Sequence, residues 1–405
     1  MNIIRSGNTT YLADRYVYTG IAASLFMMSA ILWMPSSLGV MHDAFAFRTV
    51  TLGHLAFAES IGFLLATIFT GTVPNRQLAR VINIGCALLI VTNIILAFTP
   101  AAPSFLLPVR AVAGLGAGVG FGYGLKICGL SSSPTRSFGL FTGAMSVTMI
   151  IGFQLLAHAT DAYGRRNGAI DATDMRTIAA AIWIAFATFS VAAWLLFVTN
   201  NPSGQLITTP NGPTQKIRGA LPAPMILLVL LAIVVAFIAQ GSVWAFLQIL
   251  GVSHGYAVAE VAHAMSAFAI MGIVGSLTAA SVPSHLPRWR LIGIAQPVLW
   301  AGLYALYAPA SLPWYIVGCA VGGFYWNFIL PLNLGLLAHM DPTGRAPVLG
   351  GSMSSVGSAL GPLLAGTLIQ GADYRPVGWM VAVLCTIAFT LVTISERHTP
   401  ATVAA

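Results

Sequence analysis

The sequence is divided into apolar stretches of about 20 residues, the length that a helix needs to cross a ~30 Å hydrocarbon layer. Helices are expected rather than strands, because Gly and Pro occur inside the stretches and no run alternates strictly between apolar and polar residues. Only 7% of the residues are charged, whereas soluble domains carry about 25%. These features predict an all-α membrane protein with twelve transmembrane helices, at residues 16–39, 50–72, 81–99, 105–126, 137–159, 178–198, 223–249, 259–282, 291–308, 313–337, 347–369 and 376–395.

The basic residues are distributed unevenly over this predicted topology. With a cytoplasmic N-terminus, twelve of the 18 Lys and Arg residues fall on the cytoplasmic side and five on the outer side, with Arg110 inside a span. Cytoplasmic loops carry such an excess, so both termini are predicted to be cytoplasmic, in a multi-pass protein of a bacterial inner membrane. The first span is too long for a cleaved signal peptide and is expected to be retained. No basic cluster with interleaved aromatic residues suggests a nucleic-acid partner.

An internal repeat relates the two halves at an offset of about 205–210 residues. Pro134-Thr135-Arg136 before the fifth span matches Pro342-Thr343-Gly344-Arg345 before the eleventh, and Met145-Ser146 matches Met353-Ser354. Between the halves lies a segment rich in Asn, Pro, Gly, Thr and Ser, which is typical of a flexible linker. We therefore predict two pseudo-symmetric six-helix bundles, at residues 1–198 and 223–405, joined by a cytoplasmic linker at 199–222.

Two sequence patterns resemble motifs of the major facilitator superfamily of transporters. The loop after the second span has an eroded G-x-x-x-D-R-x-G-R-R pattern, in which Asn75 replaces the aspartate and Leu78 the second glycine. The fourth span keeps the pattern R-x-x-x-G-x-G-x-G. The residues that carry the two patterns are Gly71, Asn75, Arg76, Arg80, Arg110, Gly114, Gly116 and Gly118. The resemblance covers essentially the full length and implies the fold of that superfamily, with the substrate bound between two rocking bundles.

Two ionisable residues lie well inside the predicted spans, Glu59 in the second and Arg110 in the fourth. A charge at the centre of a transmembrane helix costs at least ~2.5–3.5 kcal/mol, which favours a functional interpretation. We predict that Glu59 binds and releases a proton and that Arg110 biases its proton affinity. The alternative is a structural ion pair, or a Glu59 carboxyl kept neutral by a hydrogen bond. The second half has no acid at the matching place, where Phe268 or Ala269 stands, so coupling is expected in the first half.

Aromatic and amide side chains form polar faces on several spans. The resemblance implies that spans one, four, seven and ten line the central cavity. The predicted substrate-binding residues are Arg110, Trp33, Gln154, Gln240, Trp244, Tyr325, Trp326 and Asn327. Such a pocket suits a small organic compound that is aromatic or offers a carboxylate to Arg110. The alternative for each buried amide is that it joins two helices by hydrogen bonds.

Polar residues near the ends of the spans are predicted to form gates. Arg76 and Arg80 of the eroded motif are expected at the cytoplasmic gate. His54 and His263 occupy matching places near the outer ends of spans two and eight. Glu260 precedes His263 by three residues, the spacing at which side chains on one helix face pair. These three residues are predicted to form an outer gate, with interfacial polar caps as the alternative.

The sequence thus predicts a secondary active transporter that moves a small organic solute by alternating access. Proton-coupled uptake is favoured, because the Gly-Pro pair of drug/proton antiporters is missing from the fifth span; proton-antiport efflux of drugs or metabolites is the alternative. A non-transporting membrane sensor is a remote alternative. No catalytic triad, clustered metal site, phosphate loop or CxxC spacing occurs, so neither an enzyme, a cofactor, a metal site nor a disulfide is expected. The expected partners are the substrate, protons and lipid, and the chain is predicted to be monomeric.

Overall fold

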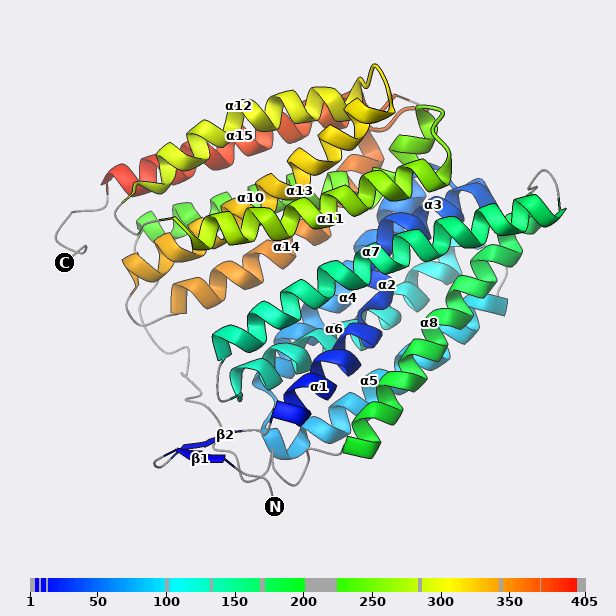
Figure 1. Ribbon diagram of the computed structural model, residues 1–405, viewed down its shortest axis with the longest axis horizontal. Helices are drawn as coiled ribbons and strands as arrows, with labels where there is room; N and C mark the ends of the chain where they lie inside the picture. The colour runs from blue at the N-terminus through cyan, green and yellow to red at the C-terminus, as the bar shows by residue number, and fades with distance from the viewer. Residues whose placement is uncertain are drawn as a thin grey trace. The chain divides into compact units, whose positions relative to one another are not determined.

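In the computed structural model, the described residues are almost all helical (Figure 1). They are residues 4–6, 9–11, 14–98, 102–131, 134–167, 172–200, 224–282, 286–341, 345–371 and 373–398. A short antiparallel pair of strands, β1 (Ile4–Ser6) and β2 (Thr9–Tyr11), precedes the helices. The helices are α1 (Asp14–Met27), α2 (Ser29–Leu32), α3 (Met34–Phe45), α4 (Thr49–Thr72), α5 (Asn75–Phe98), α6 (Pro103–Gly129), α7 (Pro134–Asn167), α8 (Ala172–Asn200), α10 (Pro224–Ser253), α11 (Val258–Ala280), α12 (Arg288–Tyr307), α13 (Leu312–Met340), α14 (Arg345–Leu368) and α15 (Arg375–His398).

The predicted spans correspond closely to these helices. Within the part of the chain that the structure describes, nine helices are long and apolar enough to cross a membrane, namely α4, α5, α6, α7, α8, α10, α11, α13 and α15. The predicted spans nine and eleven fall on α12 and α14, and the first falls on α1 to α3. The predicted all-helical membrane fold is confirmed.

The first span differs from its prediction, because α1, α2 and α3 replace the single continuous helix expected at residues 16–39. The interruptions lie at Met28 and Trp33, where the backbone departs from regular helix, with φ −90° and ψ 0° at Met28 and φ −106° and ψ 19° at Trp33. Pro35 follows the second interruption. A proline lacks the N–H group and disfavours helical geometry in the residue before it, which accounts for the distortion near Trp33.

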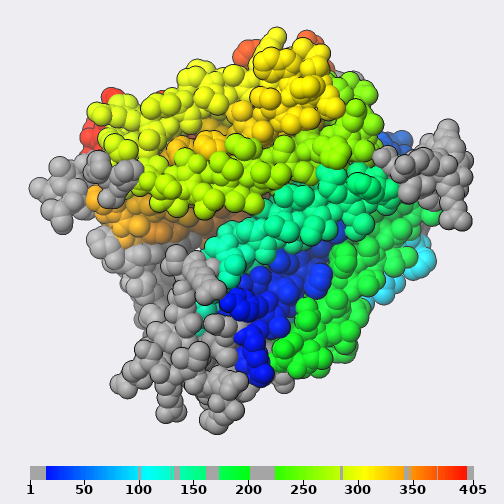
Figure 2. Space-filling model, viewed as in Figure 1, coloured from blue at the N-terminus to red at the C-terminus, as the bar shows by residue number. Residues whose placement is uncertain are grey.

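The first of two compact units comprises Met1–Phe45, Ala58–Thr148 and Asp171–Arg218. In this unit α5 packs against α6 and α8, and α1 packs against the same two helices. Figure 2 shows α1, in dark blue, and α8, in green, side by side at the surface of the unit.

The second unit comprises Ala46–Phe57, Met149–Ile170 and Gly219–Ala405. Here α10 packs against α14 and α15, α11 packs against α13, and α12 packs against α13 and α15. Helices α4 and α7 each contribute residues to both units. The predicted linker lies outside the described residues, apart from Thr199 and Asn200 at the end of α8.

Glycines allow two helix pairs to approach to backbone contact. A Cβ atom at Gly114 of α6 would lie 2.0 Å from the Glu59 carbonyl oxygen of α4. A Cβ atom at Gly323 of α13 would lie 2.0 Å from the Phe268 carbonyl oxygen of α11. Gly114 and Gly323 are 209 residues apart, and so are Glu59 and Phe268. This separation lies within the offset of about 205–210 residues that the sequence repeat predicts. The two halves therefore use the same helix contact, in which Phe268 is the counterpart of Glu59.

Gly114→Ala is expected to lower the melting temperature of the purified protein markedly. The added methyl group would overlap the Glu59 carbonyl oxygen, and overpacking of this kind costs about 1–3 kcal/mol or more. Gly139→Ala in α7 is the matched control, because a Cβ atom there has nothing within 4 Å and alanine favours a helix by up to about 1 kcal/mol. Equal melting temperatures for the two variants would contradict the close contact.

Candidate functional site

The predicted buried pair is present in the first unit. Glu59 of α4 and Arg110 of α6 are both 0% exposed, and Arg110 Nη2 donates a hydrogen bond to Glu59 Oε2. Gly114 follows Arg110 by one turn of α6 and brings that helix against the backbone of Glu59. The close helix contact thus positions the two charged side chains to meet.

The hydrogen-bonding capacity of this pair is only partly used. Glu59 Oε1, Arg110 Nε and Arg110 Nη1 are buried without a hydrogen-bond partner among the described residues. The guanidinium Cζ lies 4.9 Å from the ring centroid of Trp183 in α8, a cation–π contact. Buried polar groups are normally satisfied, and these three atoms are exceptions to that rule.

Aromatic side chains connect Trp33 to the pair. The rings of Trp33 and Phe186 are 5.6 Å apart, and those of Phe186 and Trp183 are 5.8 Å apart. Trp33 Nε1 donates to the Thr148 carbonyl oxygen at 2.9 Å. We call Glu59, Arg110, Trp183, Phe186 and Trp33 the charged cluster; it lies within the first unit.

A second group of predicted residues lies within the second unit. The ring of Trp244 in α10 is 5.9 Å from Phe153 and 5.3 Å from Phe268, and Phe268 is 6.2 Å from Trp326. Trp326 is 1% exposed, and its Nε1 atom is buried without a partner in the described part of the chain. We call Phe153, Trp244, Phe268 and Trp326 the aromatic cluster; three of its rings are buried and Trp244 is partly exposed.

Three other predicted residues of the second unit have local partners. Tyr325 donates its hydroxyl hydrogen to Gln296 Oε1 at 2.7 Å. The Asn327 amide donates to the Gly323 carbonyl oxygen of its own helix at 2.9 Å. Gln240 Oε1 accepts a hydrogen bond from the Ser358 hydroxyl at 3.2 Å. These contacts stabilise helix packing, and they use groups that were predicted to face substrate.

Gln154 of α7 links two of the predicted roles. Its Nε2 atom donates to the Ser266 hydroxyl at 2.8 Å and lies 3.2 Å from His263 Nδ1. Gln154 was predicted to bind substrate and His263 to form an outer gate, and the structure brings the two together on α7 and α11, within the second unit.

The remaining gate residues are at helix ends or on the surface. Glu260 Oε2 accepts the backbone N–H of Ala257 at 2.8 Å and so caps α11; it forms no ion pair with His263 in the described part of the chain. His54 is exposed on α4, and Arg76 and Arg80 are exposed in the first turns of α5. The spacing of Glu260 and His263 indicated a pair, but the start of α11 takes the carboxylate instead, because N-terminal N–H groups lack partners within the helix.

Sequence comparison identifies the family. The profile of the Major Facilitator Superfamily matches residues 18–354, which is more than half of the chain. The chain belongs to this superfamily. No curated protein sequence matches it significantly. Two solved structures share the fold: a mutant of the nucleoside transporter NupG, with a TM-score of 0.67 and 12% identity over 94% of this chain and 99% of that one, and NupG itself, with a TM-score of 0.66 and 14% identity over 95% and 99%.

A member of the Major Facilitator Superfamily is a multi-pass membrane transporter of small solutes and not an enzyme, which confirms the predicted class. Within the described residues, no group of three or more His, Cys, Asp or Glu side chains is placed to hold a metal ion. Cys86, Cys128, Cys319 and Cys385 are buried free thiols.

Several site residues of this superfamily transporter were missed by sequence reasoning. They are Trp183, Phe186, Phe153, Phe268 and Ser266. Each lies in an apolar stretch without a motif of its own, and its partner is distant in sequence. The internal repeat held one usable signal, because it narrowed the counterpart of Glu59 to Phe268 or Ala269, and the structure assigns Phe268.

Proposed function

We propose that this superfamily transporter takes up a small aromatic or carboxylate compound together with protons, and that Glu59 carries the proton. The observation that supports this most is the fully buried Glu59–Arg110 pair, in which three polar atoms have no partner among the described residues. A pair that served only to join α4 and α6 would be expected to satisfy its hydrogen bonds, since each unmet one costs about 1–3 kcal/mol.

The pair provides a simple route to coupling. An arginine stays charged at any physiological pH, so only Glu59 can change its charge. Protonation of Glu59 weakens its attraction for Arg110 and leaves the guanidinium able to bind a substrate carboxylate through its planar donors. Substrate on Arg110 in turn favours a neutral Glu59, because binding equilibria that affect one another do so reciprocally. The proton and an anionic substrate are then carried together, which is symport.

The aromatic cluster supports the proposal that the substrate is aromatic. Trp244 of this cluster is partly exposed and can stack on an aromatic ring, and Trp326 Nε1, which has no partner among the described residues, can donate a hydrogen bond to a polar group of the substrate. The structurally similar NupG is described as a nucleoside transporter. A nucleoside also has an aromatic base, so nucleosides belong beside aromatic carboxylates among the candidate substrates.

The gates complete the proposal. The Gln154–His263 contact and the capping Glu260 suit an outer gate, since Glu260 and His263 lie in the first two turns of α11. The exposed arginines Arg76 and Arg80 suit the cytoplasmic side, and with the excess of basic residues on that side they support a topology with both termini in the cytoplasm of a bacterium. Efflux by proton antiport is the second candidate function. It differs from proton-coupled uptake in that the substrate leaves the cell as protons enter.

A transport assay tests the proposal and its direction. Aromatic carboxylates and nucleosides are first screened by thermal shift, because a ligand of the folded state raises the melting temperature. The best binder is then offered to proteoliposomes with an acidic exterior and an alkaline interior. We expect accumulation inside the vesicles that a protonophore abolishes. Expulsion of preloaded substrate against its gradient under this same inward proton gradient would instead establish antiport. No response to any proton gradient would refute proton coupling.

A further inference from the structure

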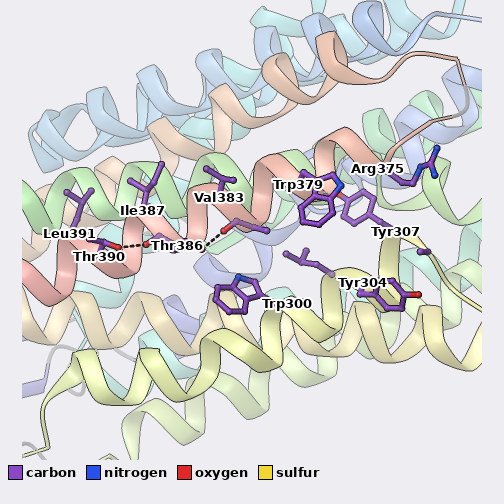
Figure 3. Close-up of a pocket in the computed structure, with 14 residues that line it drawn as sticks. Trp300, Tyr304, Tyr307, Arg375, Trp379, Val383, Thr386, Ile387, Thr390 and Leu391 are labelled. Atoms are coloured by element: carbon purple, nitrogen blue, oxygen red, sulfur yellow. Dashed lines mark hydrogen bonds between the residues drawn. The ribbon is translucent and has the colours of Figure 1, made fainter.

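Helices α12 and α15 of the second unit enclose a long groove of about 760 Å³ (Figure 3). Arg375 and Tyr307 lie at one end of it, and Thr390 and Leu391 lie at the other. This volume falls within the ~300–1,000 Å³ that small-molecule sites occupy. We call it the α12–α15 groove.

Small residues form the floor of the groove and large aromatic residues form its rims. A Cβ atom at Gly378 would lie 2.9 Å from the ring of Tyr307, so α15 approaches α12 closely at this point. Trp300, Tyr304 and Trp379 line the groove with exposed fractions of 45%, 75% and 73%. Exposed aromatic surface of this extent needs an apolar neighbour.

The interior of the groove offers almost no polar group. Thr386 donates its hydroxyl hydrogen to the Ala382 carbonyl oxygen at 2.7 Å, and Thr390 donates to the Thr386 carbonyl oxygen at 2.9 Å (Figure 3). Both hydroxyls are thus satisfied within α15. The interior therefore suits a hydrocarbon chain rather than a polar solute.

One end of the groove carries an exposed pair of opposite charges. Arg375 Nε lies 2.9 Å from Asp373 Oδ1, and the two side chains are 72% and 43% exposed. Arg375 Nη2 donates to Asp373 Oδ2 at 3.2 Å, which leaves Nη1 outside the pair. Hydrogen bonds from the Arg375 side chain and backbone hold the pKa of Asp373 below its ordinary value, so the carboxylate stays charged.

The dimensions match those of one lipid leaflet. Twelve residues separate Arg375 from Ile387, which is roughly 18 Å of helix at ~1.5 Å per residue. Half of a ~30 Å hydrocarbon layer is about 15 Å. Trp379 is one turn from Arg375 at the start of α15, and tryptophan is enriched near the ends of membrane spans. A lipid with its headgroup at Arg375 would extend its acyl chain to about Ile387.

We propose that the α12–α15 groove binds one phosphatidylethanolamine molecule of the leaflet that borders the start of α15. Its phosphate contacts Arg375, its ammonium group contacts Asp373, and one acyl chain fills the groove. An exposed pair of opposite charges is complementary to a zwitterionic headgroup. The ammonium group donates hydrogen bonds to a carboxylate, which the choline headgroup cannot do because it has no N–H. This site is separate from the proposed transport chemistry of Glu59 and Arg110.

Native mass spectrometry of the purified full chain tests the proposal with three added dioleoyl lipids, phosphatidylethanolamine, phosphatidylglycerol and phosphatidylcholine. We expect the native chain to retain one phosphatidylethanolamine about tenfold more tightly than either of the others. Asp373→Asn keeps an oxygen acceptor for the Arg375 backbone but leaves its guanidinium uncompensated. The preference of this variant is expected to switch to the anionic phosphatidylglycerol.

A second variant tests the groove itself. Ala382→Trp fills its middle and is expected to lose all three lipids, whereas Ile294→Trp is placed on an exposed part of α12 that does not line the groove and should bind as the native chain does. Melting temperatures establish that each variant is folded. Equal retention of the three lipids by the native chain, unchanged retention in Ala382→Trp, or a retained mass equal to a second chain would each overturn the proposal; the last would make the groove a dimer interface.

Discussion

Glu59→Gln is expected to abolish proton-driven accumulation of substrate in proteoliposomes, while exchange of labelled for unlabelled substrate continues. One pH unit corresponds to ~1.36 kcal/mol per proton, so with one proton per substrate the native chain should concentrate substrate up to about tenfold at that gradient. Glutamine keeps the size of the side chain and an oxygen that can accept from Arg110. The glutamine side chain cannot bind or release a proton at the pH values of the assay. The ratio of internal to external substrate should therefore stay near one.

The matched control is Asp43→Asn, which makes the same acid-to-amide change at an exposed position of α3 in the same unit. This variant should accumulate substrate as the native chain does. Accumulation by Glu59→Gln at the native level would show that the proton is carried elsewhere. Loss of exchange together with accumulation, in a variant with a native melting temperature, would show that Glu59 acts in substrate movement itself rather than in coupling.

Much of the fold could be predicted because it follows from local properties of the chain. The length of each apolar stretch sets the length of a spanning helix, and the bilayer leaves helices as the only choice for such stretches. The interruption of the first span could not be placed in this way. The interruption at Trp33 lies beside Pro35, and a proline inside an apolar stretch predicts only a local distortion. The interruption at Met28 has no proline within one turn.

The charged cluster was predictable in part for a similar reason. Glu59 and Arg110 are the two ionisable residues well inside the predicted spans, and their opposite charges indicated that they interact, as they do in the structure. Trp183 was not predictable, because its place over Arg110 depends on the packing of α8 in the same unit. Gln154 and His263 are separated by 109 residues, and their individual positions gave no sign of a shared contact. Side-chain contacts that depend on how each helix is rotated about its axis thus cannot be predicted from the length of the apolar stretches and the spacing of residues.

Arg110→Met is expected to reduce the stability of the purified protein by about 3–5 kcal/mol, because it leaves the Glu59 carboxylate buried without its partner. Adding Glu59→Leu to this variant should restore most of the loss. Replacement of both members of a buried ion pair by apolar residues of similar size is often neutral or stabilising. A double-mutant cycle measures the coupling between the two positions, with unfolding followed in detergent by denaturant titration.

The double variant also distinguishes a structural pair from a coupling pair. Its near-native stability would show that the fold does not need the two charges, so that any loss of transport reflects chemistry and not misfolding. We expect this variant to bind an aromatic substrate through the separate aromatic cluster but to show no proton-driven accumulation. Proton-driven accumulation at the native level in a stable double variant would show that the pair does not carry the coupling. Contacting charged partners depart from additivity by about 0.5–3 kcal/mol. Additive losses of stability would therefore mean that Glu59 and Arg110 do not interact energetically.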